Sequence, residues 1–156
     1  MIILDIEASG LHPESYPIEI AWQDTERSDN FDTLFIKPAE TWTYWDDYAE
    51  TKIHHISRHT IIEQGIPIED ACLRLNRSLE GKTIYSDAIE YDQRWMMKLF
   101  NVAGVVPTFN FGSILDFLPQ DGELQFNQLL EEAEIKHRAL DDARQISSFI
   151  NKLTKS

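Results

Sequence analysis

The stretch Ile2-Ile3-Leu4-Asp5-Ile6-Glu7 is an aliphatic run interrupted by two acids, and it decides the fold. Such a run predicts a buried β-strand over residues 2–6. Side chains two positions apart on a strand share a face, so Asp5 and Glu7 should lie side by side. Carboxylates crowded on an apolar strand repel each other and resist burial unless a cation joins them. The pair therefore predicts a site for a hard divalent ion, and the alternative is an exposed strand end with two hydrated acids.

The rest of the chain predicts strands and helices in a mixed order. Aliphatic and aromatic runs predict further strands at residues 18–22, 31–36, 82–85 and 108–111. The first three strands follow one another without a helix, which favours an antiparallel meander. Helical spacing of apolar residues predicts helices at residues 67–79, 91–103, 124–133 and 139–153. Because helices follow the fourth and fifth strands, those strands should run parallel to the first.

Two other acidic segments extend the pattern along the chain. Ser86-Asp87-Ala88-Ile89-Glu90-Tyr91-Asp92 lies in the middle, and His137-Arg138-Ala139-Leu140-Asp141-Asp142-Ala143 lies near the end. The resulting order is Asp-x-Glu, then Asp, then His-x(4)-Asp. It resembles the DEDDh superfamily of 3′–5′ exonucleases, which includes ribonuclease T, oligoribonuclease and polymerase proofreading subunits. Other stretches that resemble family motifs are residues 4–11, Ile18-Glu19-Ile20-Ala21 and Ile53-His54-His55-Ile56-Ser57.

The resemblance implies a fold. Family members have an RNase H-like α/β fold, in which helices flank a mixed five-stranded sheet whose second strand is antiparallel. The strand pattern described above agrees with that architecture. Since the sequence contains no repeat, low-complexity segment or second domain that we can identify, we expect a single domain over residues 1–156.

The resemblance also implies a site. The metal ligands would be Asp5, Glu7, Asp92 and Asp142, and they would hold two divalent cations, Mg²⁺ or Mn²⁺. His137 would be the catalytic residue, because an imidazole can accept the proton of an attacking water near neutral pH. Leu11 would bind substrate as a wedge beside the terminal base, unless it packs in the core. The implied partner is the 3′ end of single-stranded RNA or DNA, which would release 5′-mononucleotides.

Two aspartates compete for the middle position of the pattern. Asp92 follows an aromatic residue, as the family aspartate does, and it falls in the first turn of a helix, where a carboxylate is favoured. Asp87 falls at a strand end and could be a turn acid. We expect Asp92 to be the ligand. The family often has His-Asn where this chain has Asp87 and Ala88, so the surroundings of this motif differ.

Two aspartates also compete at the end of the pattern. Residues five apart on a helix are about 140° out of register, so His137 and Asp142 could converge only if the helix begins between them. A start at Ala139 satisfies this condition. The family pattern His-x-Ala-x-x-Asp-Ala then matches Asp142, and Asp141 would face outward, near Arg144 or Arg138.

Composition limits the class of partner. The chain has 27 acidic and 14 basic residues and a net charge of −13. A protein that wraps long duplexes usually has a basic stripe, and none is visible here. The charge is compatible with an enzyme that grips only the last nucleotides of a strand, and equally with no nucleic-acid binding.

The single cysteine and the hydropathy pattern suggest where the chain works. Cys72 falls on a helical apolar pattern and should be a core thiol. No hydrophobic stretch approaches a membrane span, and the first strand leaves little room for a leader, so we expect a cytoplasmic protein that does not contact membranes. Many relatives are homodimers, and this chain could be one.

Two other function classes compete with the exonuclease. A non-catalytic, exonuclease-like binding module would fit the negative charge and the altered middle motif. An aspartate-based phosphatase would use a nucleophilic Asp followed two residues later by an Asp, and Glu7 departs from that pattern. The phosphatase hypothesis also leaves His137 and Asp142 unexplained.

The aromatic segment at residues 42–48 has no clear periodicity. Its rings could stack on bases, bury against the sheet or form a dimer contact. The aromatic and aliphatic residues at 95, 96, 99 and 100, by contrast, have helical core spacing and should pack inside.

Overall fold

A mixed sheet forms the centre of the molecule in the computed structural model, which describes residues 1–133 and 137–155. Within these residues the sheet has five strands, in the order β3-β2-β1-β4-β5. The strands are β1 (Ile2–Ala8), β2 (Pro17–Asp24), β3 (Phe31–Phe35), β4 (Thr83–Ser86) and β5 (Asn110–Ser113). The pairs β1–β2 and β2–β3 are antiparallel, whereas β1–β4 and β4–β5 are parallel. The predicted meander and the predicted parallel strands are therefore both confirmed.

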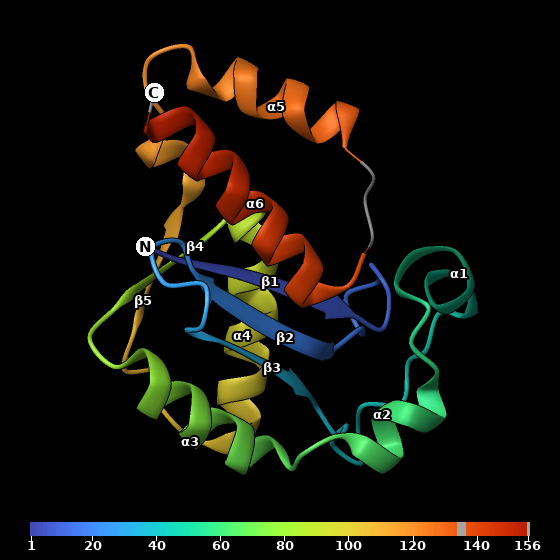
Figure 1. Cartoon of the computed structure of the whole chain (residues 1–156). Coiled ribbons are helices and arrows are strands. Elements are labelled where there is room, and N and C mark those ends of the chain that lie inside the picture. Colours follow the sequence, from blue (N-terminus) through green and yellow to red (C-terminus); the bar gives the residue numbers. More distant parts are fainter. Residues whose placement is uncertain (134–136, 156) are drawn as a thin grey trace.

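Helices cover both faces of this sheet (Figure 1). One face carries α4 (Ile89–Ala103), and α3 (Ile68–Leu79) packs against α4. The opposite face carries α6 (Ala139–Thr154), which lies on β1 and β2, with α5 (Gly122–Glu132) packed outside it. The arrangement is a three-layer α/β structure, as the sequence predicts.

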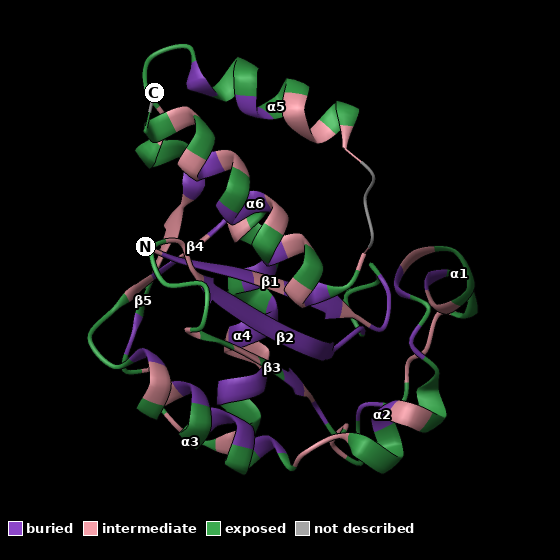
Figure 2. Ribbon diagram, in the orientation of Figure 1, coloured by how far each residue is buried: buried purple, intermediate pink, exposed green. Residues whose placement is uncertain are grey.

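Strand β1 contributes side chains to both layers. Ile2, Leu4 and Ile6 belong to the core beneath α3 and α4. Ile3 faces the other way, into the smaller core formed with α5 and α6. Figure 2 shows β1 and β2 as the most continuously buried part of the sheet. Because side chains alternate along a strand, the face that begins with Ile3 continues to Asp5 and Glu7.

The predicted helices at residues 67–79 and 91–103 are confirmed with small shifts. Pro67 is the residue before α3 and not a member of its first turn, which suits a residue with no N–H to donate. Gly81 adopts φ 70°, which a glycine accommodates without strain, and it lies just beyond the end of α3. The fifth strand begins two residues later than predicted, at Asn110.

Residues 39–66, which have no clear periodicity, contain three short helical elements. These are α1 (Asp47–Ala49), the π-helical turn η1 (Glu50–His54) and α2 (Arg58–Gln64). A further 3₁₀ turn, η2 (Ile114–Phe117), follows β5. Such short elements give no periodic signal in a sequence, because each presents less than two turns to the core.

The aromatic segment has two roles in the fold. Trp42 is 7% exposed, belongs to the larger core and stacks on Tyr16 with ring centroids 5.5 Å apart. Tyr48, in contrast, is 66% exposed. The segment therefore anchors itself in the core through one ring and presents another at the surface. Cys72, together with Trp95, Met96, Leu99 and Phe100, is buried as predicted.

The described helices include none that could span a bilayer, because none combines enough length with enough apolar character.

Candidate active site

The carboxyl ends of β1 and β4 form one edge of the sheet, and acids gather there. The parallel register pairs Ile2 with Ile84 and Ile3 with Tyr85. Continuing this register by two residues brings Asp87, the first residue after β4, level with Asp5. Adjacent side chains at one level of a sheet share a face, so the two carboxylates are neighbours.

Helix α4 supplies another acid to the same edge. Asp92 lies in the first turn of α4, as predicted, and is only 4% exposed. Its Oδ2 atom accepts a hydrogen bond of 2.5 Å from the hydroxyl of Ser86, the last residue of β4. The hydroxyl of Ser86 in turn accepts from the N–H of Ala88. The end of β4 and the start of α4 are thus tied together at the acid cluster.

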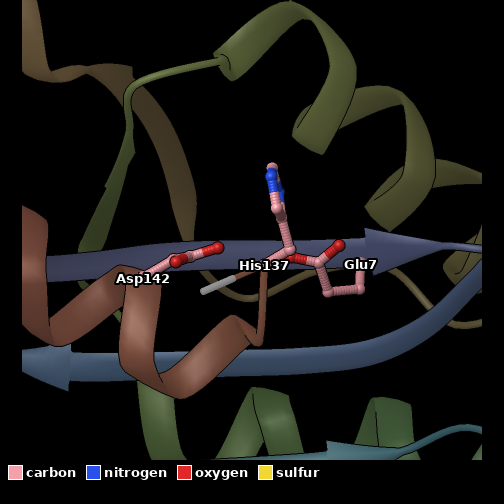
Figure 3. A group of neighbouring side chains, drawn as sticks. All are labelled: Glu7, His137 and Asp142. Atoms are coloured by element: carbon pink, nitrogen blue, oxygen red, sulfur yellow. The ribbon is translucent and has the colours of Figure 1, made fainter. Parts of the chain in front are cut away.

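Helix α6 begins at Ala139, between His137 and Asp142, as predicted. His137 lies before the helix at φ 52°, a left-handed conformation uncommon for residues other than glycine. Asp142 lies in the first turn of α6. Figure 3 shows His137 on the segment that enters α6, with Asp142 and Glu7 beside it. Asp141 is exposed and belongs to none of the potential metal-binding groups of the described residues.

The donor atoms form two groups among the described residues. One group contains Glu7, His137 and Asp142, and the other contains Asp5, Asp87 and Asp92. Within each group the three donor atoms lie within 4.8 Å of one another. The first two positions of the sequence pattern are therefore divided between the groups, although Asp5 and Glu7 share one strand face.

Burial and like charge weaken the acidity of this cluster. Loss of solvent is the main reason why the pKa of Asp5 lies well above its usual range, and the charges of Asp92 and Glu7 add to the shift. Burial raises the pKa of Glu7 to about 9, with the charge of Asp142 as the next cause. Burial raises the pKa of Asp92 to about 7 and that of Asp142 to about 6. His137 acts in the opposite direction on Asp142 and lowers its pKa. Without cations, the cluster holds protons that ordinary carboxyls would release.

An ion pair between the exposed Arg138 and the buried Glu19 fixes the start of α6. Glu19 on β2 is 2% exposed, and its carboxylate accepts hydrogen bonds from Arg138 Nη2 at 2.8 Å and Nε at 3.2 Å. The same carboxylate accepts from the N–H of Ala139 at 2.7 Å. The pair joins residues 119 positions apart. It holds the first turn of α6, and hence Asp142, against the sheet.

The donor atoms line a pocket of about 420 Å³. Its walls include the exposed side chains of Leu11, Tyr48 and Tyr91, which are 77%, 66% and 50% exposed. Leu11 is therefore not a core residue, so the alternative of core packing is excluded. Its role in substrate binding stays a prediction. With divalent cations bound to its acidic floor, a pocket with an apolar rim suits a ligand that carries both a phosphate and a flat base.

His54 adds a buried polar group to the pocket wall. It is 1% exposed, and its Nδ1 atom accepts a hydrogen bond of 2.9 Å from the N–H of Ile56. Nε2 must then carry the proton in the neutral ring, and this buried donor has no partner among the described residues. Burial lowers the pKa of His54, which favours the neutral ring. The pocket thus contains a neutral hydrogen-bond donor that could meet a ligand.

The acid cluster fits divalent cations on two counts. The Oδ2 atom of Asp5 is buried and has no hydrogen-bond partner among the described residues. In the described residues no ion pair involves any of the five clustered acids, and the nearby Arg138 is bound to Glu19. Buried carboxylate oxygens without a cationic side chain are a donor set that Mg²⁺ and Mn²⁺ prefer.

The structure brings the predicted residues to one pocket. Asp5, Glu7, Asp92, Asp142, His137 and Leu11 all line it. Asp87, which the sequence analysis ranked below Asp92, joins the same group as Asp92. The pocket residues Tyr48, His54 and Tyr91 were not predicted as site residues. Base stacking was one of the roles left open for the aromatic segment at residues 42–48, which includes Tyr48, and residues 53–57, which include His54, resemble a family motif. Tyr91 was noted only as the aromatic residue before Asp92.

Solved structures with a similar fold are exonucleases. Exonuclease I from Methylocaldum szegediense superposes with a TM-score of 0.74 at 18% identity and covers 99% of this chain. E. coli exonuclease I in complex with a dA16 oligonucleotide gives a TM-score of 0.75 at 16% identity, also over 99% of this chain. The complex with a dT13 oligonucleotide gives 0.72 at 16% identity over the same share. The RNase H-like α/β fold predicted from the sequence is therefore confirmed.

The likeness concerns the fold of one part of those proteins. This chain spans 41% of the length of the Methylocaldum szegediense protein and 40% of the E. coli protein in the dA16 complex. No protein-family model and no curated protein matches the chain. Membership of the DEDDh superfamily stays a prediction.

Proposed function

We propose that this chain is a metal-dependent 3′–5′ exonuclease that removes 5′-mononucleotides from the 3′ end of single-stranded or short nucleic acid. The observation that carries the proposal is the convergence of acids and a histidine from four chain segments on one apolar-rimmed pocket. The likeness to exonuclease I structures, some solved with single-stranded oligonucleotides, supports it further.

The proposed residues divide the work of phosphodiester hydrolysis. Asp5, Glu7, Asp92 and Asp142 would hold two divalent cations, Mg²⁺ or Mn²⁺. When bound, such ions lower the pKa of water and offset charge that develops on the phosphate.

His137 would act as the general base. A water oxygen attacks the last phosphorus, and the bond from phosphorus to the 3′ oxygen of the preceding nucleotide breaks. A ring nitrogen of His137 would take the proton of the water, and the departing 3′ oxygen would take a proton from solvent. The products are a 5′-mononucleotide and a strand with a new 3′ hydroxyl. The proximity of the His137 ring to carboxylate oxygens of Glu7 and Asp142, within 4.8 Å, supports this role, since it places the ring beside acids that are proposed to hold the cations.

The rim of the pocket would hold the terminal nucleotide. Leu11, Tyr48 and Tyr91 offer exposed apolar surface on which a base can stack. The Nε2–H group of His54 would donate to an oxygen of the same nucleotide. Each of these contacts tolerates any base, so we expect little sequence preference. Contact with only the terminal nucleotide also agrees with a net charge of −13, since the protein then needs to neutralise few phosphates.

The direct test uses single-stranded RNA and DNA of one sequence, labelled at the 5′ end. Each substrate is incubated with the protein in Mg²⁺, in Mn²⁺ and in EDTA. We expect a ladder that shortens from the 3′ end, requires metal and reveals which sugar is preferred. His137→Ala should abolish the ladder, whereas His59→Ala, which alters a side chain that is 77% exposed, should not.

Intact substrate in every metal lane would contradict the exonuclease. The negative net charge and the acid at position 87 would then favour the non-catalytic binding module, and binding of the same oligonucleotides would be measured next. Sedimentation of the full chain would test the predicted homodimer in the same preparation.

A further inference from the structure

We infer that Asp87 is a fifth carboxylate ligand, which completes a three-carboxylate cation site with Asp5 and Asp92. The inference rests on the proposed metal-dependent function. It goes beyond the four acids of the sequence pattern, because the pattern assigns no role to this position.

Geometry is the first reason. Donor atoms of Asp5, Asp87 and Asp92 lie within 4.8 Å of one another. Oxygens that bind one cation at about 2.1 Å lie at most about 4.2 Å apart, so these carboxylates need only small side-chain movements to share one. The sheet register contributes to this proximity, because continuing it past Ile3 and Tyr85 sets Asp87, the first residue after β4, level with Asp5. Asp92 approaches from α4 and is fixed by its hydrogen bond from Ser86.

An unpartnered buried atom is the second reason. The Oδ2 atom of Asp5 is buried and accepts no hydrogen bond from any described residue. A buried carboxylate oxygen in this state costs free energy that a bound cation can recover. Because Asp5 belongs to this group of three, a cation held between Asp5, Asp87 and Asp92 would lie beside the carboxylate that has the unpartnered oxygen.

The lack of another role for Asp87 is the third reason. It takes part in none of the ion pairs of residues 1–133 and 137–155. It does not cap α4 with its side chain, since the residue before that helix is Ala88. Although the residue as a whole is exposed, its carboxylate lies within 4.8 Å of donor atoms of Asp5 and Asp92, so the acid is turned toward the cluster. If Asp87 were only a turn residue, its carboxylate would be more stable facing water than facing the other acids.

The two groups of donors differ in a way that has a measurable consequence. With Asp87, one group offers three carboxylates, whereas the other offers two carboxylates, Glu7 and Asp142, beside the proposed general base His137. The cation of the three-carboxylate group should then bind before any nucleic acid does, and more tightly than the cation beside Glu7 and Asp142. Without Asp87, the first of these cations would have only Asp5 and Asp92 and would depend on substrate oxygens.

Titration of the metal-free full chain with Mn²⁺ tests this inference without any measurement of activity. Calorimetry, together with electron paramagnetic resonance of free Mn²⁺, counts the ions bound per chain. We expect two ions in the unaltered protein. Asp87→Asn should leave one ion bound as before and weaken the other roughly 10- to 100-fold. Asp92→Asn should weaken that same ion, whereas Glu7→Gln should weaken the other.

Asp141→Asn is the matched control, because it removes the same charge from an exposed position beside the site. It should leave both affinities unchanged. Asp87→Ala is a second variant that should reproduce the loss seen with Asp87→Asn. Far-ultraviolet circular dichroism and thermal unfolding of the metal-free variants check that they fold.

Each outcome decides between the two proposals. Unchanged binding of both ions in Asp87→Asn and Asp87→Ala overturns the role of Asp87 and leaves the exonuclease intact. Binding of two ions without cleavage of any nucleic acid overturns the exonuclease and leaves the cation site. A protein that binds no Mn²⁺ overturns both.

Discussion

Glu7 and Glu19 face one another across the β1–β2 pair, and both are almost fully buried, at 9% and 2% exposed. Their surroundings differ. Glu19 accepts hydrogen bonds from the Arg138 guanidinium and from the Ala139 N–H. Glu7 instead lies beside Asp142 and His137, and burial raises its pKa to about 9. The guanidinium of Arg138 thus neutralises Glu19, the carboxylate that holds the fold together. Glu7, the carboxylate of the proposed active site, would receive its positive charge from a bound metal ion.

The largest expected effect separates the two neighbouring aspartates at the start of α6. Asp142→Asn should lower cleavage about a thousandfold or more, because it removes a proposed ligand of the cation beside Glu7. Asp141→Asn should keep most of the activity, since its side chain points away from the cluster. Rates on the preferred oligonucleotide in Mn²⁺, with circular dichroism as a fold check, measure this difference. Equal losses in both variants would overturn the assignment of Asp142.

One variant at each glutamate site should change the stability of the protein in opposite directions. Arg138→Met leaves Glu19 buried without its cation, so the free energy of unfolding should fall by about 2–4 kcal/mol. Glu7→Gln removes a repelled carboxylate, so the metal-free protein should become more stable at about pH 8. Denaturant unfolding in EDTA measures both. A loss of stability in Glu7→Gln comparable to that in Arg138→Met would show that Glu7, too, is held by the fold.

Stability of the metal-free protein should fall as pH rises. Burial raises the pKa of Asp92 to about 7 and that of Glu7 to about 9, above their values in the unfolded chain. At a pH above the pKa values of the unfolded chain and below these raised values, the folded state binds more protons than the unfolded state. The free energy of unfolding therefore decreases as the pH rises. Burial lowers the pKa of His54 from 6.5, which has the opposite effect at lower pH.

The comparison is therefore made between about pH 6.5 and about pH 8.5, where the clustered acids dominate. Thermal unfolding in EDTA should give a Tm several degrees lower at the higher pH, and Mn²⁺ should restore it. The double variant Asp5→Asn with Glu7→Gln should show a flatter profile. A Tm that is constant or rises over this interval would contradict uncompensated burial of these acids.

The smallest effect is expected at the rim. Leu11→Ala should lower kcat/KM roughly tenfold through lost contact with the terminal base, with stability unchanged within about 0.5 kcal/mol. Leu124→Ala is the matched control, since Leu124 on α5 is 64% exposed and lies outside the pocket. Steady-state kinetics on one oligonucleotide compare the two. The same kcat/KM in both variants would remove Leu11 from the substrate site.

The sequence by itself determined the features that arise from local pattern. Two-residue alternation put Asp5 and Glu7 on one face of β1, and helical spacing gave α3, α4 and α6. The requirement that a helix begin between His137 and Asp142 was also local, because it depends only on the rotation per residue. The resemblance of several motifs to the DEDDh superfamily implied the type of fold, and the pattern of strands and helices agreed with it.

Tertiary structure alone decided how the acids are grouped and which glutamate forms an ion pair with Arg138. The register of β1 against β4 brings Asp87 beside Asp5, and the β1–β2 register with the path into α6 gives Arg138 to Glu19 and not to Glu7. Asp5 and Asp87 are 82 positions apart in the sequence, and Glu19 and Arg138 are 119 positions apart. Periodicity carries no information about such pairings, since they depend on how separate strands and helices pack.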